Sequence, residues 1–271
     1  MHLSRAAVAL LAGALVLTQG CASAPKGTRG SSLDVPFEPT SESTSKQVAQ
    51  YVDAPAIRSV DAIKLPIIEI DDAAVDASIT GEQADLVANR AARDVCTGLA
   101  PFIRIGDAQD ASSVRITVRA IKATSSGAAG VSEVIGLFVP GPFRLPAGLG
   151  GFAADGVLQI GSNPAAALQW SKGANPITEG ARISAIGDAY QLAGDFADAF
   201  VDLVLDARSV GGDRPEHLDG AAIEANRTRC FDTFGKANAA GAGASLLIGL
   251  PPESIDAGAP REPASRSNGT N

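Results

Sequence analysis

The alternation of apolar and polar residues over positions 113–123 constrains the fold more than any other stretch of the chain. Val114, Ile116 and Val118 are separated by polar side chains, so an extended backbone places all three on one face. A strand with one buried face and one hydrated face is typical of an antiparallel sheet. The segment therefore predicts a sheet with a hydrophobic core on one side.

Two neighbouring runs, residues 152–160 and 165–172, predict a hairpin in this sheet because Gly-Ser-Asn-Pro separates them. The single tryptophan, Trp170, lies in the second run and is interpreted as a packing residue rather than a platform for a ligand. Further upstream, residues 60–70 are apolar and β-branched. Because Pro66 lies within this run, we expect one strand that is at the edge of the sheet or bulged at the proline.

Two segments predict helices that pack on this sheet. Thr80 and Gln83 have the spacing of a capping box, and apolar residues recur at helical spacing behind them. Over residues 188–208 one apolar stripe recurs with the helical period: Ala189, Leu192, Ala193, Phe196, Phe200, Leu203 and Val204. Helices that follow strands in this way predict an α+β fold, a two-layer sandwich with two main helices on one face of an antiparallel or mixed sheet.

The first 20 residues have the pattern of a lipoprotein signal peptide. Arg5 precedes an apolar run over residues 6–17, which is too short to span a bilayer, since spanning needs roughly 20 residues. Gly20 and Cys21 follow this run directly, as lipidation of the cysteine thiol requires. We therefore predict that Cys21 is the lipid-bearing first residue of the mature protein.

A second cleavage site is the alternative to lipidation. Ala-Ser-Ala at positions 22–24 fits an ordinary signal peptidase site, and its use would remove Cys21. That cut falls before Pro25, whose tertiary amide makes a poor substrate. Because Ala22 rather than Asp follows Cys21, the sorting rules of lipoproteins predict transfer to the outer membrane, with the protein facing the periplasm.

The composition along the chain predicts five parts. The chain has 271 residues, 45% of them hydrophobic, which suffices for one domain with a sizeable core. After the signal peptide, residues 21–50 are expected to form the lipidated cysteine and a flexible tether, because Ser, Thr, Pro and Gly dominate them. An α+β domain over residues 51–208 is followed by an extension over residues 209–250 with a candidate helix at 219–236, and by a disordered tail over residues 251–271.

Two cysteines remain besides Cys21. Cys96 and Cys230 could pair in an oxidising compartment, or they could be two buried free thiols, and their spacing does not decide between these alternatives.

The sequence offers little for catalysis, metals or cofactors. His2 is lost with the leader, so a His-dependent hydrolase or zinc site would rest on His217 alone. The glycine pattern at residues 148–153 lacks the following helix that a nucleotide needs, and we reject a nucleotide site. A row of aspartates is interpreted as a solvated helix face rather than a metal site: Asp195, Asp198, Asp202 and Asp206. We expect no enzymatic activity, no cofactor and no metal.

The net charge of −8 disfavours nucleic acid as a partner, because phosphates would repel the chain. The stretch most suited to binding a partner is the connector over residues 127–151, an apolar segment with two charged residues. If exposed, five of its side chains would form a contact for a protein partner or a lipid; if buried, they would cover the sheet. These are Val134, Ile135, Leu137, Phe138 and Phe143.

Several stretches together resemble a family of bacterial lipoproteins, the domain-of-unknown-function family 3313. They are QYVDAPAIRSVDAIKLPIIEI, SSVRITVRAIKA, RLPAGLGGFAADG, ALQWSKGAN and ISAIGDAYQLAGDFADAF, and they cover about residues 50–206. The resemblance implies an N-terminal lipidated cysteine, matched by Cys21, and a compact α/β domain, but no catalytic residues. We expect a non-enzymatic interaction or accessory subunit of the cell envelope, anchored in the membrane by its lipid. The alternative is a periplasmic carrier or binder of a small hydrophobic ligand or lipid.

Overall fold

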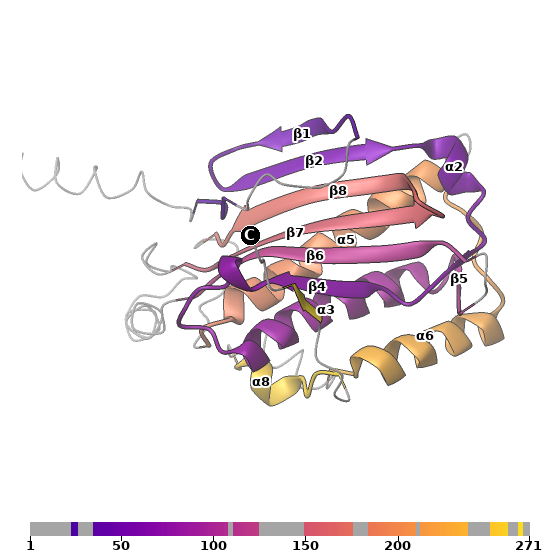
Figure 1. The fold of residues 1–271 in the computed structure, drawn as a ribbon. Helices are drawn as coiled ribbons and strands as arrows, with labels where there is room; N and C mark the ends of the chain where they lie inside the picture. The colour runs from indigo at the N-terminus through magenta and orange to yellow at the C-terminus, as the bar shows by residue number, and fades with distance from the viewer. Residues whose placement is uncertain are drawn as a thin grey trace, which may run out of the picture.

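A mixed β-sheet with helices on one face forms the centre of the molecule (Figure 1). The computed structural model describes residues 23–26, 35–107, 111–124, 149–175, 184–209, 212–237, 250–259 and 265–267. Within them seven strands follow the order β1-β2-β8-β7-β6-β4-β9. Their bounds are β1 Glu38–Glu42, β2 Lys46–Val52, β4 Ile67–Asp71, β6 Ser113–Lys122, β7 Gly151–Ile160, β8 Asn163–Gly173 and β9 Ser265–Ser267.

The helices of the same ranges are α2 Ala54–Arg58, α3 Gly81–Leu99, α5 Gly187–Arg208, α6 Gly220–Phe234 and α8 Pro252–Ile255. Figure 1 shows α3 and α5 behind the sheet, both on one face. Strand β4 pairs with β6 and β9 in parallel, and the other neighbours in the sheet are antiparallel. The α+β class, the mixed sheet and the two helices on one face are therefore confirmed. None of the helices described is long and apolar enough to cross a bilayer.

The patterns that predicted individual elements correspond to real ones. In β6, Val114, Ile116 and Val118 are at most 1% exposed and face the helices. Helix α3 begins with the capping box of Thr80 and Gln83, in which each side chain accepts a hydrogen bond from the other residue's backbone N–H. Strands β7 and β8 form the hairpin in antiparallel register, and Trp170 is buried in the core.

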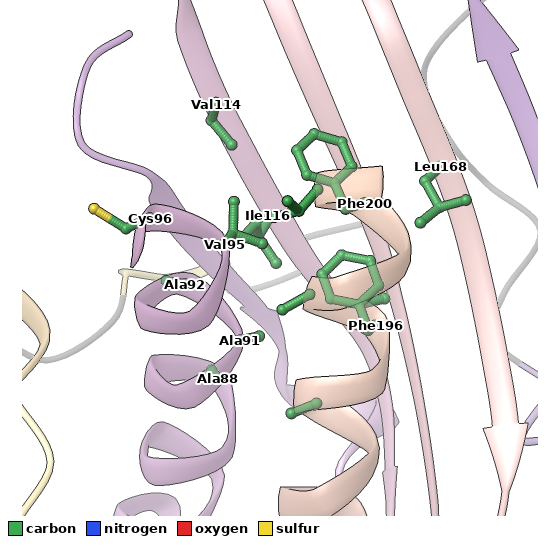
Figure 2. Close-up of a cluster of buried hydrophobic side chains, with 14 of the residues drawn as sticks. Ala88, Ala91, Ala92, Val95, Cys96, Val114, Ile116, Leu168, Phe196 and Phe200 are labelled. Carbon is green, nitrogen blue, oxygen red and sulfur yellow. The ribbon is translucent and has the colours of Figure 1, made fainter. Parts of the chain in front are cut away.

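Aromatic side chains of α5 fill the layer between helices and sheet. Phe196 and Phe200 are fully buried, and Figure 2 shows them among alanines and Val95 of α3 and the strand residues Ile116 and Leu168. The rings come this close to β7 because Gly156 has no side chain: a Cβ there would lie 2.7 Å from the Phe200 ring. The helix and the strand are thus fitted to each other at Gly156.

A disulfide fastens α6 to α3. Cys96 and Cys230 are bonded, with an S–S distance of 2.07 Å and 5.8 Å between their Cα atoms, so the first of the two alternatives for these cysteines is correct. The predicted third helix is confirmed as α6, capped by Asp219. Its buried stripe consists of Asn226, Cys230 and Phe234. Asn226 donates to backbone carbonyls of Ala100 and Ile103 and accepts from the N–H of Ile105.

A buried ion pair holds part of the C-terminal segment. Arg93 of α3 lies 2.7 Å from the carboxylate of Asp256, and their side chains are 5% and 0% exposed. The hydroxyl of Tyr190 on α5 donates to the same carboxylate. Burial opposes the charge of Asp256, but the hydrogen bond and charge of Arg93 outweigh it and lower the pKa of Asp256. Burial and the bond to Asp256 raise the pKa of Tyr190 to about 12.

Three predictions from sequence are wrong. The tether predicted over residues 21–50 includes β1 and most of β2, and β2 pairs along its whole length with β8. The tail predicted as disordered over residues 251–271 includes α8, β9 and the buried Asp256. The single strand predicted over residues 60–70 is two strands, β3 Ala62–Ile63 and β4, because Pro66 lies between them; β3 pairs with β5, Arg104–Ile105.

Reduction of the disulfide should lower the free energy of unfolding by roughly 4 to 5 kcal/mol, because the bond closes a long loop in the unfolded chain. Urea unfolding of the oxidised and the reduced protein measures the difference. The double variant Cys96→Ala, Cys230→Ala in its oxidised preparation serves as the control and should match the reduced protein. A loss below about 1 kcal/mol would mean that Asn226 and Phe234 hold α6 without the bond.

Replacing Asp256 by Asn should cost about 3 to 5 kcal/mol at pH 7, because Arg93 would stay buried without its counter-charge. Since the pKa of Asp256 is lowered in the folded state, its contribution is present above the unfolded pKa of about 3.9 and is lost as the pH falls through the folded pKa. Urea unfolding at several acidic pH values should show this loss in the native protein and not in the variant. The exposed Asp206→Asn is the control and should stay within about 0.5 kcal/mol of the native protein.

Candidate functional site

Residues 23–26, the first described residues after Cys21, are part of the fold. The N–H of Ala24 donates to the carbonyl of Thr44 at 2.8 Å, and Ser171 Oγ donates to the carbonyl of Pro25 at 2.7 Å. Ala24 is 7% exposed. We call this arrangement the N-terminal dock, formed by Ala24 and Pro25 with Thr44, Gly151 and Ser171. It lies where β7 begins and β8 ends, beside the turn between β1 and β2 (Figure 1).

Gly151 makes the dock possible. A Cβ at this position would lie 2.8 Å from Pro25 Cγ and 3.2 Å from the carbonyl oxygen of Lys172. Only a glycine lets the proline rest on the start of β7 without displacement.

A hollow of about 440 Å³ lies next to the dock, lined by residues of β1, β2 and the turn between them and by residues of β6, β7 and β8. Arg119 of β6 and Asp155 of β7 form an ion pair of 2.9 Å there, and both side chains are mostly buried. Burial raises the pKa of Asp155, and Arg119 offsets part of this rise. The apolar part of the lining consists of Pro25, Pro39, Val48 and Trp170. Nine further lining residues are polar or small: Ser41, Glu42, Ser43, Thr44, Gln47, Ala49, Ala153, Gln169 and Ser171. Such a lining suits a polar group rather than a hydrophobic molecule.

Thr124, before the apolar connector, and Gly150, near its end, are held at one point. The buried carboxylate of Asp188, in the first turn of α5, accepts hydrogen bonds from Thr124 Oγ1 at 2.9 Å and from the N–H of Gly150 at 2.8 Å. The N–H of Thr124 also donates to the carbonyl of Ala185. We call Thr124, Gly150 and Asp188 the connector neck. Gly150 precedes Gly151 of the dock, so the neck and the dock lie at the same end of the sheet.

The structure places the other candidate residues as follows. Cys21 and the five connector residues, Val134, Ile135, Leu137, Phe138 and Phe143, lie outside the described residues. His217 is exposed in a loop, with its ring 4.6 Å from that of Phe102. Asp198, Asp202 and Asp206 are exposed on α5, as expected of a solvated face. Burial and neighbouring carboxylates raise the pKa of Asp198. Across the described ranges, no three His, Cys, Asp or Glu side chains gather as metal ligands would.

Sequence reasoning missed the dock and the neck. The adjacent glycines at 150 and 151 were the available signal, because paired glycines at the start of a strand often mark a close backbone approach. The partners of Asp188 and Ser171 lie far away in the chain, so no local pattern could have revealed them.

Comparison with known proteins gives little further information. No family model matches the chain, so the resemblance to the domain-of-unknown-function family 3313 stays a prediction, and no curated protein matches it either. Among solved structures, the chain is similar to a PelC dodecamer from Paraburkholderia phytofirmans, with 14% identity, a TM-score of 0.37, and coverage of 60% of this chain and 99% of that chain. A variant of that PelC dodecamer gives a TM-score of 0.32 at the same identity and coverage. Likenesses of this size establish neither a shared fold nor a shared function.

Replacing Gly151 by Ala should release the N-terminal dock, because the new Cβ would collide with Pro25. Hydrogen exchange of the Ala24 amide should become faster by about tenfold or more, as expected when its hydrogen bond is lost. Gly106→Ala is the matched control, since a Cβ at Gly106 meets no atom within 4 Å. Unchanged exchange at Ala24 in the Gly151 variant would contradict the role given to Gly151.

Proposed function

We propose that this protein is a periplasm-facing lipoprotein of the outer membrane, attached by lipid at Cys21, that acts as a non-enzymatic interaction or accessory subunit in the cell envelope. The observation that carries the proposal is the common position of the N-terminal dock and the connector neck. The chain segment nearest to the lipid site and the apolar connector leave the fold at one end of the sheet.

The packing of the described core supports a contact role for the connector. Side chains of α3 and α5 fill the helix-side face of the sheet, and Asp188 holds Thr124 and Gly150 together at the neck. The described residues thus form a packed core, to which the connector is joined at the neck. Its apolar residues, Val134 to Phe143, are proposed to bind an envelope protein beside the membrane.

The alternative, a carrier of a small hydrophobic ligand, has less support. The hollow beside the dock is lined mainly by polar side chains and holds the Arg119–Asp155 pair. These groups would lose their hydration against a hydrophobic ligand and gain no hydrogen bond in return.

The anchor is tested by Cys21→Ser. Palmitate labelling should be lost, and the protein should move from the membrane fraction to the soluble fraction, because the thiol that accepts the lipid is absent. Ser23→Ala, two residues further on, is the control and should keep both the label and the membrane association. A Cys21→Ser protein that stays labelled and membrane-bound would exclude lipidation at this position.

The contact is tested by cross-linking in intact cells followed by purification. The double variant Phe138→Ser, Phe143→Ser should lose a defined cross-linked partner that the native protein retains, because its two largest connector side chains become polar. Val52→Ser is the control: Val52 is 36% exposed and lies at the end of β2 opposite to Lys46. Recovery of the same partner from the double variant would assign the contact to another surface.

A further inference from the structure

We propose that the end of the sheet that carries the N-terminal dock rests on the lipid headgroups, and that the β7–β8 turn at Gly161 and Ser162 points away from the membrane. This inference rests on the lipidation of Cys21 proposed above. It replaces the free domain on a long tether, which the sequence predicted, with a domain held in one orientation. The partner of this surface is the polar face of a bilayer.

The first argument is the length of chain between lipid and fold. Ala24 is fixed by its bond to Thr44 and is buried, and three residue steps separate it from Cys21. Even a fully extended chain spans only about 3.3 to 3.6 Å per residue, so these steps reach roughly 10 Å. The headgroup layer on one side of a bilayer is itself roughly 5 to 8 Å thick. A lipid on Cys21 therefore brings the dock to the headgroups.

The second argument is the length of the sheet. Strand β7 has 10 residues and β8 has 11, and a strand rises about 3.3 Å per residue, so the sheet is about 33 Å long in this direction. The dock lies at one end of these strands, and Ser162 lies in the turn at the other. Because the lipid is attached near one end of these strands, that end can lie at the membrane surface while the other end lies about 33 Å away from it.

The third argument is the chemistry of the dock end. Lys26, Lys46 and Lys122 are exposed there, and long lysine side chains can extend their ammonium groups to lipid phosphates. Glu42 and Asp76 are exposed near the same end, and Asp76 interacts with Lys122. Lysine and carboxylate charges thus offset one another. The short attachment, rather than net charge, sets the orientation, so the contact should not depend on salt.

The experiment uses the full lipidated protein in vesicles of phosphatidylethanolamine and phosphatidylglycerol that contain a nitroxide-headgroup lipid. A fluorophore is attached to Glu42→Cys, at the dock end, or to Ser162→Cys, at the far turn; both positions are exposed. The native thiols do not compete, because Cys96 and Cys230 are bonded and Cys21 carries the lipid under the proposal. Quenching at position 42 should be about threefold or more that at position 162, because about 33 Å of strand separates them.

A spacer variant separates orientation from anchoring. Insertion of 20 Gly and Ser residues between Ala22 and Ser23 keeps the lipid site but gives the domain a reach of roughly 25 Å, so the two labels should be quenched alike. Equal quenching at positions 42 and 162 without the spacer, in protein whose mass shows the lipid, would overturn the orientation alone. Protein whose mass shows no lipid would overturn both the anchor and the orientation. Stronger quenching at position 162 would mean that the β7–β8 turn, and not the dock end, faces the membrane.

Discussion

The packing of α5 on the sheet depends on the fit of two phenylalanine rings against one glycine. Phe196 and Phe200 occupy the space that a side chain at Gly156 would fill, so α5 can pack directly on β7. Helix α3 lies beside α5 on the same face, and its alanines leave room for the rings. Burial of apolar area is the main favourable term in folding, and most of the buried apolar side chains among the described residues belong to one cluster that includes this layer. The strands that are distant from the layer depend on backbone pairing instead.

Local patterns predicted the elements that carry their own apolar residues. Three patterns each lie within one short segment and indicate its secondary structure without any distant residue. They are the alternation at Val114, Ile116 and Val118, the capping box at Thr80 and the stripe around Phe196. These segments became β6, α3 and α5. The class of fold followed from them because helices and strands with one apolar face have few ways to bury it.

Elements whose partners are distant in sequence could not be predicted in this way. Strand β1 is polar and mostly exposed, and with its neighbour β2 it is ordered by the backbone ladder to β8 rather than by its own side chains. The dock at Pro25 depends on Gly151 and Ser171, and the ion pair of Arg93 depends on Asp256. Ser, Thr and Pro content indicates that a segment cannot form a core alone, but it does not exclude that the segment joins an existing sheet. Composition therefore gave wrong predictions for both the tether over residues 21–50 and the tail over residues 251–271.

The pairing of Arg93 with Asp256 also fixes the order in which the fold can be completed. Arg93 belongs to α3, whereas its counter-charge, Asp256, follows α5, α6 and α8 in the chain. Until that carboxylate arrives, burying the guanidinium between α3 and α5 is unfavourable, because an unpaired charge is costly to remove from water. A growing chain therefore stays short of its final packing until Asp256 has been made. Under the export proposed above, such a delay keeps the polypeptide in the unfolded form that a secretion channel accepts.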